Sequence, residues 1–215
     1  MLQKFILGGA MIKNIIFDIG GVLVSFEPDR VFREMGLSEE EVQILYQHTA
    51  KSPYWKELDR GLLPKEEVFQ TMVNTMPQAY RKDAMEFFTK RIPEAVTSFD
   101  YSADWLKGLK ERGYNIYLLT NYPEWLFETH WEKGFTFTPY VDGKVVSGNV
   151  KLIKPDHAIY EALIKKYDLN PAESVFIDDV KENVQAAKEC GLNSFQFTNI
   201  DEVKAKLEEL LNKRD

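Results

Sequence analysis

Carboxylate, hydroxyl, amide and amine side chains follow four apolar runs of the chain, in "IIFD", "LLTN", "KLIKPD" and "VFIDD". The residues concerned are Asp18, Thr120 with Asn121, Lys154, and Asp178 with Asp179. Three carboxylates that converge on one cleft repel one another unless a cation lies between them, and ligands that offer only oxygen suit magnesium. A lysine and a hydroxyl group in the same cleft supply donors for the oxygens of an anion. Together the residues describe a site for a phosphate ester, although each alone also fits a turn, a helix start or a surface charge.

The elements that must position these residues alternate between strand and helix patterns. Apolar runs of strand length occupy residues 14–18, 114–120, 174–179 and 193–197, and amphipathic helical patterns occupy 102–113, 123–133, 155–168 and 180–191. The alternation predicts an α/β fold with a doubly wound, Rossmann-like parallel sheet, whose strands bring their carboxyl ends to one edge. Residues 140–150 are predicted to form a hairpin with its turn at Asp142 and Gly143.

The interval 27–97 breaks the alternation, because it holds consecutive helical patterns and no predicted strand. Ser38 and Glu41 have the spacing of a capping box at the start of one of these helices. We therefore predict an all-helical cap over 27–97, inserted into a catalytic core that comprises 11–26 and 98–215. Residues 1–10 are predicted to be an N-terminal extension, since the apolar run "FILGGA" is at the short end for a signal peptide.

The ordered motifs "FDIGGVL", "LLTN", "IKPD" and "VFIDDVKENVQAA" resemble those of the haloacid dehalogenase (HAD) superfamily of aspartate-nucleophile hydrolases. The resemblance extends from Met11 to about Leu211, and the helices inserted after the first motif are similar to one type of cap in that superfamily. Within it, the first and last motifs resemble the branch that contains sugar-phosphate phosphatases and the phosphatase domain of soluble epoxide hydrolases. The resemblance implies a magnesium-dependent phosphatase of a small phosphorylated metabolite, such as a sugar phosphate.

The same resemblance implies a role for each motif residue. Asp18 would attack phosphorus and form an aspartyl-phosphate, which water then hydrolyses. Thr120 and the Asn121 backbone N–H would bind phosphoryl oxygens, and Lys154 would neutralise charge on Asp18 and the phosphoryl group. Magnesium would be held by four residues: Asp18, the carbonyl of Gly20, Asp178 and Asp179.

Gly20 departs from the pattern of most phosphatases in this superfamily, which carry at that position a second aspartate that acts as general acid and base. Its loss should slow turnover by on the order of 10²–10⁴ if nothing replaces it. Three explanations stay open. The substrate has a good leaving group, such as an anomeric sugar phosphate or an acyl phosphate; another acid, for example Glu27, Asp29 or a cap residue, substitutes; or the chain binds a phosphorylated ligand without turnover.

The last explanation makes a catalytically weakened binding module the main alternative to a phosphatase. A 2-haloacid dehalogenase is less favoured, because such enzymes resemble "DxYGT" at the first motif and lack the acidic pair at the last. A phosphomutase is disfavoured as well, because the aspartate missing at Gly20 is central to proton transfer in those enzymes.

Several further residues have weaker signals. Asn183 could orient an aspartate or simply be a polar residue at a helix start. The segment 54–63 could line a substrate entrance, although Tyr54, Trp55 and Leu58 also have the spacing of core residues. The three histidines, His48, His130 and His157, show no metal-ligand spacing and are predicted to be structural or exposed.

The composition of the 215-residue chain limits its partners. A balance of 27 basic against 34 acidic residues gives a net charge of −7, which disfavours nucleic acid. No apolar run is long enough to span a bilayer, and the single cysteine, Cys190, excludes an intrachain disulfide framework and suits a reducing compartment. We therefore predict a cytoplasmic protein that binds a small-molecule phosphate ester, and the sequence leaves its oligomeric state open.

Overall fold

A five-stranded parallel sheet forms the centre of the computed structural model, which describes residues 11–212. The strands lie side by side in the order β5 (Gly143–Val146), β4 (Asn115–Thr120), β1 (Asn14–Phe17), β6 (Ser174–Asp178) and β7 (Asn193–Gln196). Every neighbouring pair is parallel. This order, with β1 in the middle and crossovers on both sides, confirms the predicted doubly wound α/β core.

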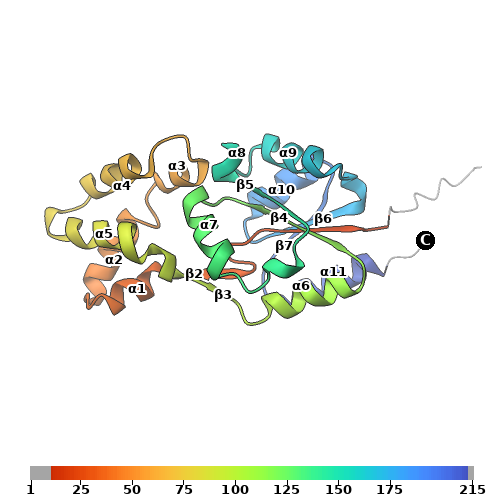
Figure 1. Cartoon of the computed structure of the whole chain (residues 1–215), viewed down its shortest axis with the longest axis horizontal. Helices are drawn as coiled ribbons and strands as arrows, with labels where there is room; N and C mark the ends of the chain where they lie inside the picture. Colours follow the sequence, from red (N-terminus) through yellow and green to blue (C-terminus); the bar gives the residue numbers. More distant parts are fainter. Residues whose placement is uncertain (1–10, 213–215) are drawn as a thin grey trace, which may run out of the picture.

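Helices cover both faces of the sheet (Figure 1). On one face α6 (Ser102–Glu111) and α11 (Ile200–Leu211) pack against Ile15 and Phe17 of β1. On the other face α9 (His157–Tyr167) and α10 (Lys181–Glu189) pack against Ile16. Because successive side chains of a strand point to opposite faces, a continuous apolar run is what a sheet covered on both faces requires.

A helical cap extends from one end of the sheet, at the left of Figure 1. It contains α1 (Pro28–Glu34), α2 (Glu39–His48), α3 (Trp55–Arg60), α4 (Lys65–Asn74) and α5 (Arg81–Glu86), followed by a π-helical turn (Phe87–Arg91) and a 3₁₀ turn (Ile92–Ala95). The Ser38 backbone N–H donates to the Glu41 carboxylate at 2.8 Å, and the Ser38 hydroxyl accepts from the Glu41 N–H at 3.5 Å. The predicted capping box is therefore present.

The remaining elements are short, apart from α7 (Glu124–Lys133), which lies between the cap and the sheet. They are α8 (Ser147–Val150) and three 3₁₀ turns at Gln78–Tyr80, Thr138–Tyr140 and Pro171–Glu173. None of the described helices is both long and apolar enough to cross a membrane.

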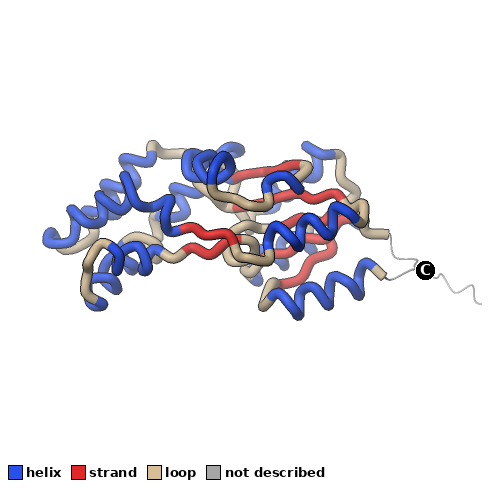
Figure 2. Tube along the Cα trace, turned by 60° about the horizontal axis from the view of Figure 1, so that its bottom comes forward, coloured by secondary structure: helices blue, strands red, loops and turns tan. Residues whose placement is uncertain are grey.

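A two-stranded antiparallel ribbon joins the cap to the core (Figure 2). It pairs β2 (Val24–Phe26) with β3 (Val96–Ser98). The expectation of no strand between residues 27 and 97 is therefore wrong at Val96 and Thr97. A strand of three residues is too short to give a recognisable alternation of apolar and polar positions.

The predicted hairpin over 140–150 is also wrong. Residues Gly143–Val146 form the edge strand β5, which pairs in parallel with β4 and leads into α8. Asp142 holds this approach in place, because its carboxylate accepts hydrogen bonds from the Ile116 N–H at 2.7 Å and from Lys110 at 2.8 Å. The Asp-Gly pair therefore begins a strand whose partner is distant in the chain, a pairing that local turn chemistry does not reveal.

Candidate active site

The carboxyl ends of three neighbouring strands bring the predicted residues together. Asp18 directly follows β1, Thr120 ends β4 and Asp178 ends β6. Carboxylate oxygens of Asp18, Asp178 and Asp179 all lie within 4.8 Å of one another. Asp18 and Asp178 are buried and Asp179 is partly buried, so their mutual repulsion is weakly screened by water.

Lys154 lies at the centre of this cluster. Its buried ammonium group donates to the Asp178 carboxylate at 2.6 Å, to the Asp18 carboxylate at 2.9 Å and to the backbone oxygen of Leu119 at 3.0 Å. These contacts use all three of its donors. Burial alone would lower the pKa of Lys154, but the charges of Asp178 and Asp18 outweigh burial and raise it. Lys154 is therefore held as a buried cation with a fixed geometry.

The two oxygens of Asp18 have different environments. Oδ1 accepts hydrogen bonds from the Ile19 N–H at 2.7 Å and from Lys154. Oδ2 receives no hydrogen bond from the described residues, so it is free to bind a cation or attack an electrophile. Burial, reinforced by the charge of Asp178, raises the pKa of Asp18 to about 7, with Lys154 opposing the rise.

Asn183 orients Asp178, as one reading of the sequence suggested. Its side-chain amide donates to both oxygens of that carboxylate, at 3.0 and 3.1 Å, and the Val180 N–H donates to one of them at 2.8 Å. Asn183 is itself buried in the first turn of α10. A buried carboxylate with this many donors keeps a single orientation.

The three carboxylates and Lys154 fit a hard divalent cation. One ammonium group against three carboxylates leaves a formal deficit of two positive charges in a buried cluster. All of the ligand atoms are oxygens, as magnesium prefers. Burial and the neighbouring charge of Asp178 raise the pKa of Asp179, as expected for carboxylates held close together.

The two glycines after Asp18 have different surroundings. Gly21 has a φ of +68°, and a Cβ atom there would lie 2.5 Å from a carboxylate oxygen of Asp179. Only glycine allows the chain to turn here while Asp179 approaches. At Gly20, by contrast, a Cβ atom would meet nothing within 4 Å, so the position that lacks the customary aspartate has space for a side chain.

Thr120 has a polar group without a partner. Its hydroxyl oxygen is buried and has no hydrogen-bond partner among the residues that the structure describes. Such a group costs about 1–3 kcal/mol when left unsatisfied, so a ligand oxygen is its natural partner. The Asn121 side chain is already engaged, since it donates to the Lys154 backbone oxygen at 3.0 Å and accepts from the Lys154 N–H at 2.8 Å.

A pocket of about 130 Å³ opens beside Gly20, and the cap supplies a carboxyl group to it. That group is Asp59 of α3, which no sequence pattern singled out, although the segment 54–63 that contains it was noted for its mixture of aromatic and charged residues. Burial, reinforced by the charge of Asp18, raises the pKa of Asp59 to about 7, against the effects of Lys154 and of a hydrogen bond from the Trp55 side chain.

The other residues of that segment divide between pocket, core and surface. Trp55 lines the same pocket, Leu58 is buried and Tyr54 is exposed. The two acids proposed as substitutes for the missing aspartate do not line this pocket. Glu27 lies 3.7 Å from Arg30, and Asp29 pairs with Arg33 at 2.8 Å on the surface of α1.

His130 lies in the interior, His48 is partly buried and His157 is exposed. His130 is buried, and its ring nitrogens contact the Tyr122 hydroxyl at 2.8 Å and the Pro93 backbone oxygen at 2.9 Å. His48 contacts the hydroxyl of Thr75, and His157 contacts Glu189.

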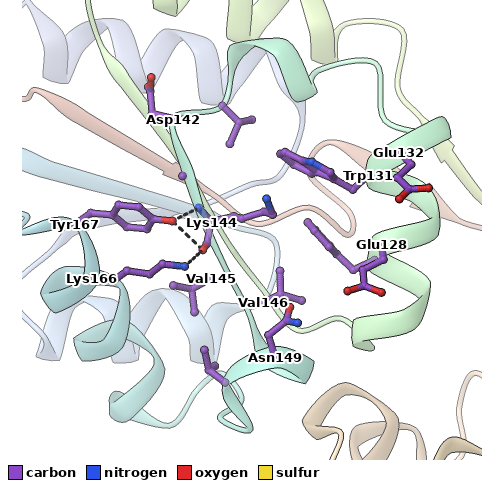
Figure 3. Close-up of a pocket in the computed structure, with 14 residues that line it drawn as sticks. Glu128, Trp131, Glu132, Asp142, Lys144, Val145, Val146, Asn149, Lys166 and Tyr167 are labelled. Carbon is purple, nitrogen blue, oxygen red and sulfur yellow. Dashed lines mark hydrogen bonds between the residues drawn. The ribbon is translucent and has the colours of Figure 1, made fainter.

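A second, larger hollow of about 700 Å³ lies away from this cluster, along the edge strand β5 (Figure 3). Trp131, Lys144 and Tyr167 are among its lining residues, and none of the predicted site residues lines it. Although this hollow is larger, the predicted residues place the reaction site elsewhere.

Comparison with known proteins identifies the family of most of the chain. The family described as haloacid dehalogenase-like hydrolase matches residues 12–191. A D-ribitol-5-phosphate phosphatase of Bacteroides thetaiotaomicron is 28% identical over 211 residues, which are 94% of this chain and all of that protein. A sesquiterpene phosphatase of Aspergillus oryzae is 27% identical, over 87% of this chain and 90% of its own length.

Solved structures share the fold. A HAD family enzyme from Bacteroides thetaiotaomicron, crystallised with magnesium and inorganic phosphate, has a TM-score of 0.67 at 22% identity and covers 89% of this chain and 98% of its own. A predicted hydrolase from Porphyromonas gingivalis has a TM-score of 0.68 at 24% identity, over 95% of this chain and all of its own. The chain therefore shares its overall fold with these two structures.

Proposed function

Because the chain belongs to the haloacid dehalogenase-like hydrolases, we propose that it is a magnesium-dependent phosphatase of small phosphate monoesters. The main support is the cluster of three carboxylates, two of which contact Lys154. The unpartnered hydroxyl of Thr120, at the end of the neighbouring strand β4, adds to it. Residues 27–97 serve as the cap and residues 11–26 and 98–215 as the catalytic core.

Asp18 is the nucleophile in this proposal. Its free oxygen attacks phosphorus as the bond from phosphorus to the leaving oxygen breaks, and the leaving oxygen takes a proton from Asp59 or from water. The products are an aspartyl-phosphate and an alcohol. Water then attacks phosphorus, releases inorganic phosphate and restores the carboxylate. Lys154 holds the other oxygen of Asp18 at 2.9 Å, so the attacking oxygen keeps one direction.

Magnesium would be held by Asp18, Asp178, Asp179 and the backbone carbonyl of Gly20. When bound, it would neutralise the charge of the transferring phosphoryl group. The Thr120 hydroxyl donates a hydrogen bond to one phosphoryl oxygen, and we assign the Asn121 backbone N–H to a second phosphoryl oxygen. Lys154 supplies a fixed positive charge beside the reacting carboxylate.

The acid missing at Gly20 is best explained by two of the three possibilities together, a good leaving group and a carboxyl from the cap. Asp59 is the cap acid that lines the pocket beside Gly20, whereas Glu27 and Asp29 are paired with arginines elsewhere. We therefore assign to Asp59 the role of the missing acid, beside the oxygen of the leaving group.

The relatives support phosphate monoesters as the substrate class and leave the alcohol open. One is named for ribitol 5-phosphate and another for a sesquiterpene. A sugar phosphate is therefore one member of the proposed class.

The alternative function is a module that binds a phosphorylated ligand without turnover, and Gly20 is the observation that favours it. A 2-haloacid dehalogenase is not favoured, because the acidic pair Asp178 and Asp179 assembles with Asp18 into a cation site.

Asp18→Asn tests the mechanism. The full chain is assayed with magnesium for phosphate release from acetyl phosphate, an anomeric sugar phosphate and alkyl phosphates. We expect the variant to lose at least about 10³-fold in kcat, with the thermal transition confirming that it folds. Turnover that survives in Asp18→Asn would exclude the nucleophile. Binding of magnesium and phosphate by calorimetry, with no turnover of any ester by the wild type, would favour the module.

A further inference from the structure

The pocket beside Gly20 differs in chemistry from the cluster it adjoins. Its walls come from the cap, the connecting ribbon, the loops after β1 and β4, and the start of α7. Its apolar lining consists of Val24, Phe26, Trp55, Val96, Pro123 and Leu126. Resting on the proposed function, we propose that this pocket receives the alcohol part of the substrate and selects a small apolar group. A single six-membered ring or a branched five-carbon chain is the class that fits.

The polar atoms of the wall are already committed. The Asn121 amide is bonded at both ends to the Lys154 backbone. The Tyr122 hydroxyl is within 2.8 Å of His130 Nδ1. Both side chains already have partners within the protein, so a sugar or polyol in this pocket would find few hydrogen-bonding groups left for its hydroxyls.

Asp59 is the one carboxyl group in the wall. It lines the pocket together with Gly20, which is two residues after Asp18 in the chain. Asp59 can contact the leaving oxygen, whereas the rest of the wall is apolar except for Asn121 and Tyr122. Each substrate hydroxyl buried there without a partner lowers affinity by roughly 5- to 150-fold.

The pocket is also small and preformed. Phe26 and Trp55 contact each other with ring centroids 5.2 Å apart, which closes one side. Ser147 of the core donates to the backbone oxygen of Asp59 at 2.6 Å, which holds α3 against the core. An apolar cavity of about 150 Å³ takes up benzene, so the observed volume of about 130 Å³ matches one ring.

Esters of primary alcohols separate pocket recognition from leaving-group reactivity. We would compare kcat/KM of the full chain, with magnesium, for benzyl phosphate, isopentyl phosphate and glycerol phosphate. We expect at least about a tenfold preference for the two apolar esters. Equal or better turnover of glycerol phosphate would overturn the inference and leave the phosphatase function standing.

Variants of the wall test the same point. Phe26→Ser removes a partly exposed ring at the pocket, and Val96→Thr replaces a methyl group by a hydroxyl at nearly constant volume. Leu62→Ser is the matched control, because Leu62 is an exposed apolar residue of the cap that does not line the pocket. Phe26→Ser should lower kcat/KM for benzyl phosphate by roughly tenfold and change glycerol phosphate less than about twofold. An equal loss on both esters would mean a structural effect and would refute the assignment.

A binding measurement keeps the inference testable without turnover. Benzylphosphonate and glyceryl phosphonate cannot be hydrolysed at phosphorus, and calorimetry with magnesium gives their affinities directly. Tighter binding of benzylphosphonate, together with no turnover of any ester, would reject the phosphatase and retain the pocket's preference. Equal binding of the two phosphonates would reject the preference itself.

Discussion

At the residue scale, the proposed chemistry depends on two oxygen atoms that have no hydrogen-bond partner among the described residues. Asp18 Oδ2 accepts no hydrogen bond from the described residues, and the Thr120 hydroxyl is buried without a partner. Lys154 and Asp178, in contrast, are fully engaged. Fixed groups therefore surround two free ones, an arrangement that is costly in a purely structural cluster and useful in one that receives a ligand.

Gly20→Asp should raise the rate for esters with poor leaving groups. The position has space for a side chain, and an added carboxyl beside the leaving oxygen can donate a proton. We expect kcat for an alkyl phosphate to rise at least about tenfold, within the 10²–10⁴ range of general acid catalysis. Acetyl phosphate, which needs little protonation, should change much less.

Gly20→Asn is the control for that variant, since it has nearly the same size and no acid. If Gly20→Asp were no faster than Gly20→Asn on alkyl phosphates, a missing proton donor would not limit the wild-type rate.

At the element scale, the edge strand β5 is protected by a side chain from α9. The Tyr167 hydroxyl accepts from the Lys144 N–H at 2.7 Å and donates to the Lys144 backbone oxygen at 3.0 Å, as Figure 3 shows. Lys166 donates to the same oxygen at 3.1 Å. An edge whose backbone groups are engaged in this way cannot easily pair with another chain.

Tyr167→Phe should weaken this protection. It keeps the ring but removes both hydrogen bonds to Lys144, so we expect the free energy of unfolding to fall by about 1 kcal/mol. Urea denaturation measures the change, and light scattering should detect more self-association. Tyr140→Phe is the matched control, because Tyr140 is also partly buried and no hydrogen bond of its hydroxyl occurs among the described residues. A loss of similar size in both variants would contradict the role given to the hydroxyl.

At the scale of the whole molecule, buried acids couple stability to pH and to metal. The pKa of Asp18 is raised to about 7 in the folded chain, above the unfolded value of about 3.9. Between about pH 4 and pH 7 the folded chain therefore binds more protons than the unfolded chain, and this group makes stability fall as pH rises.

Magnesium should reverse that loss, because it replaces the proton at the carboxylates. We expect millimolar magnesium to raise the melting temperature clearly at about pH 8 and little at about pH 5. Sodium chloride at equal ionic strength is the control, since screening of a chain with net charge −7 also stabilises it. An equal magnesium effect at both pH values would argue against binding at these carboxylates.

The sequence by itself determined the core and the order of the motif residues. Apolar runs that end in Asp18, Thr120 and Asp178 are local signals, and parallel strands necessarily bring their ends to one edge. The capping box at Ser38 was equally local, since its two partners are three residues apart. The motif set also sufficed to indicate the family.

Only the tertiary structure decided which residues meet across long chain separations. It placed Asp59 of the cap beside Gly20 and paired β5 with β4 where a hairpin was expected. These contacts depend on packing between elements, which leaves no periodic trace in a single segment. The apolar pocket could not be predicted from the sequence either, because its walls come from segments that become neighbours only in the folded chain.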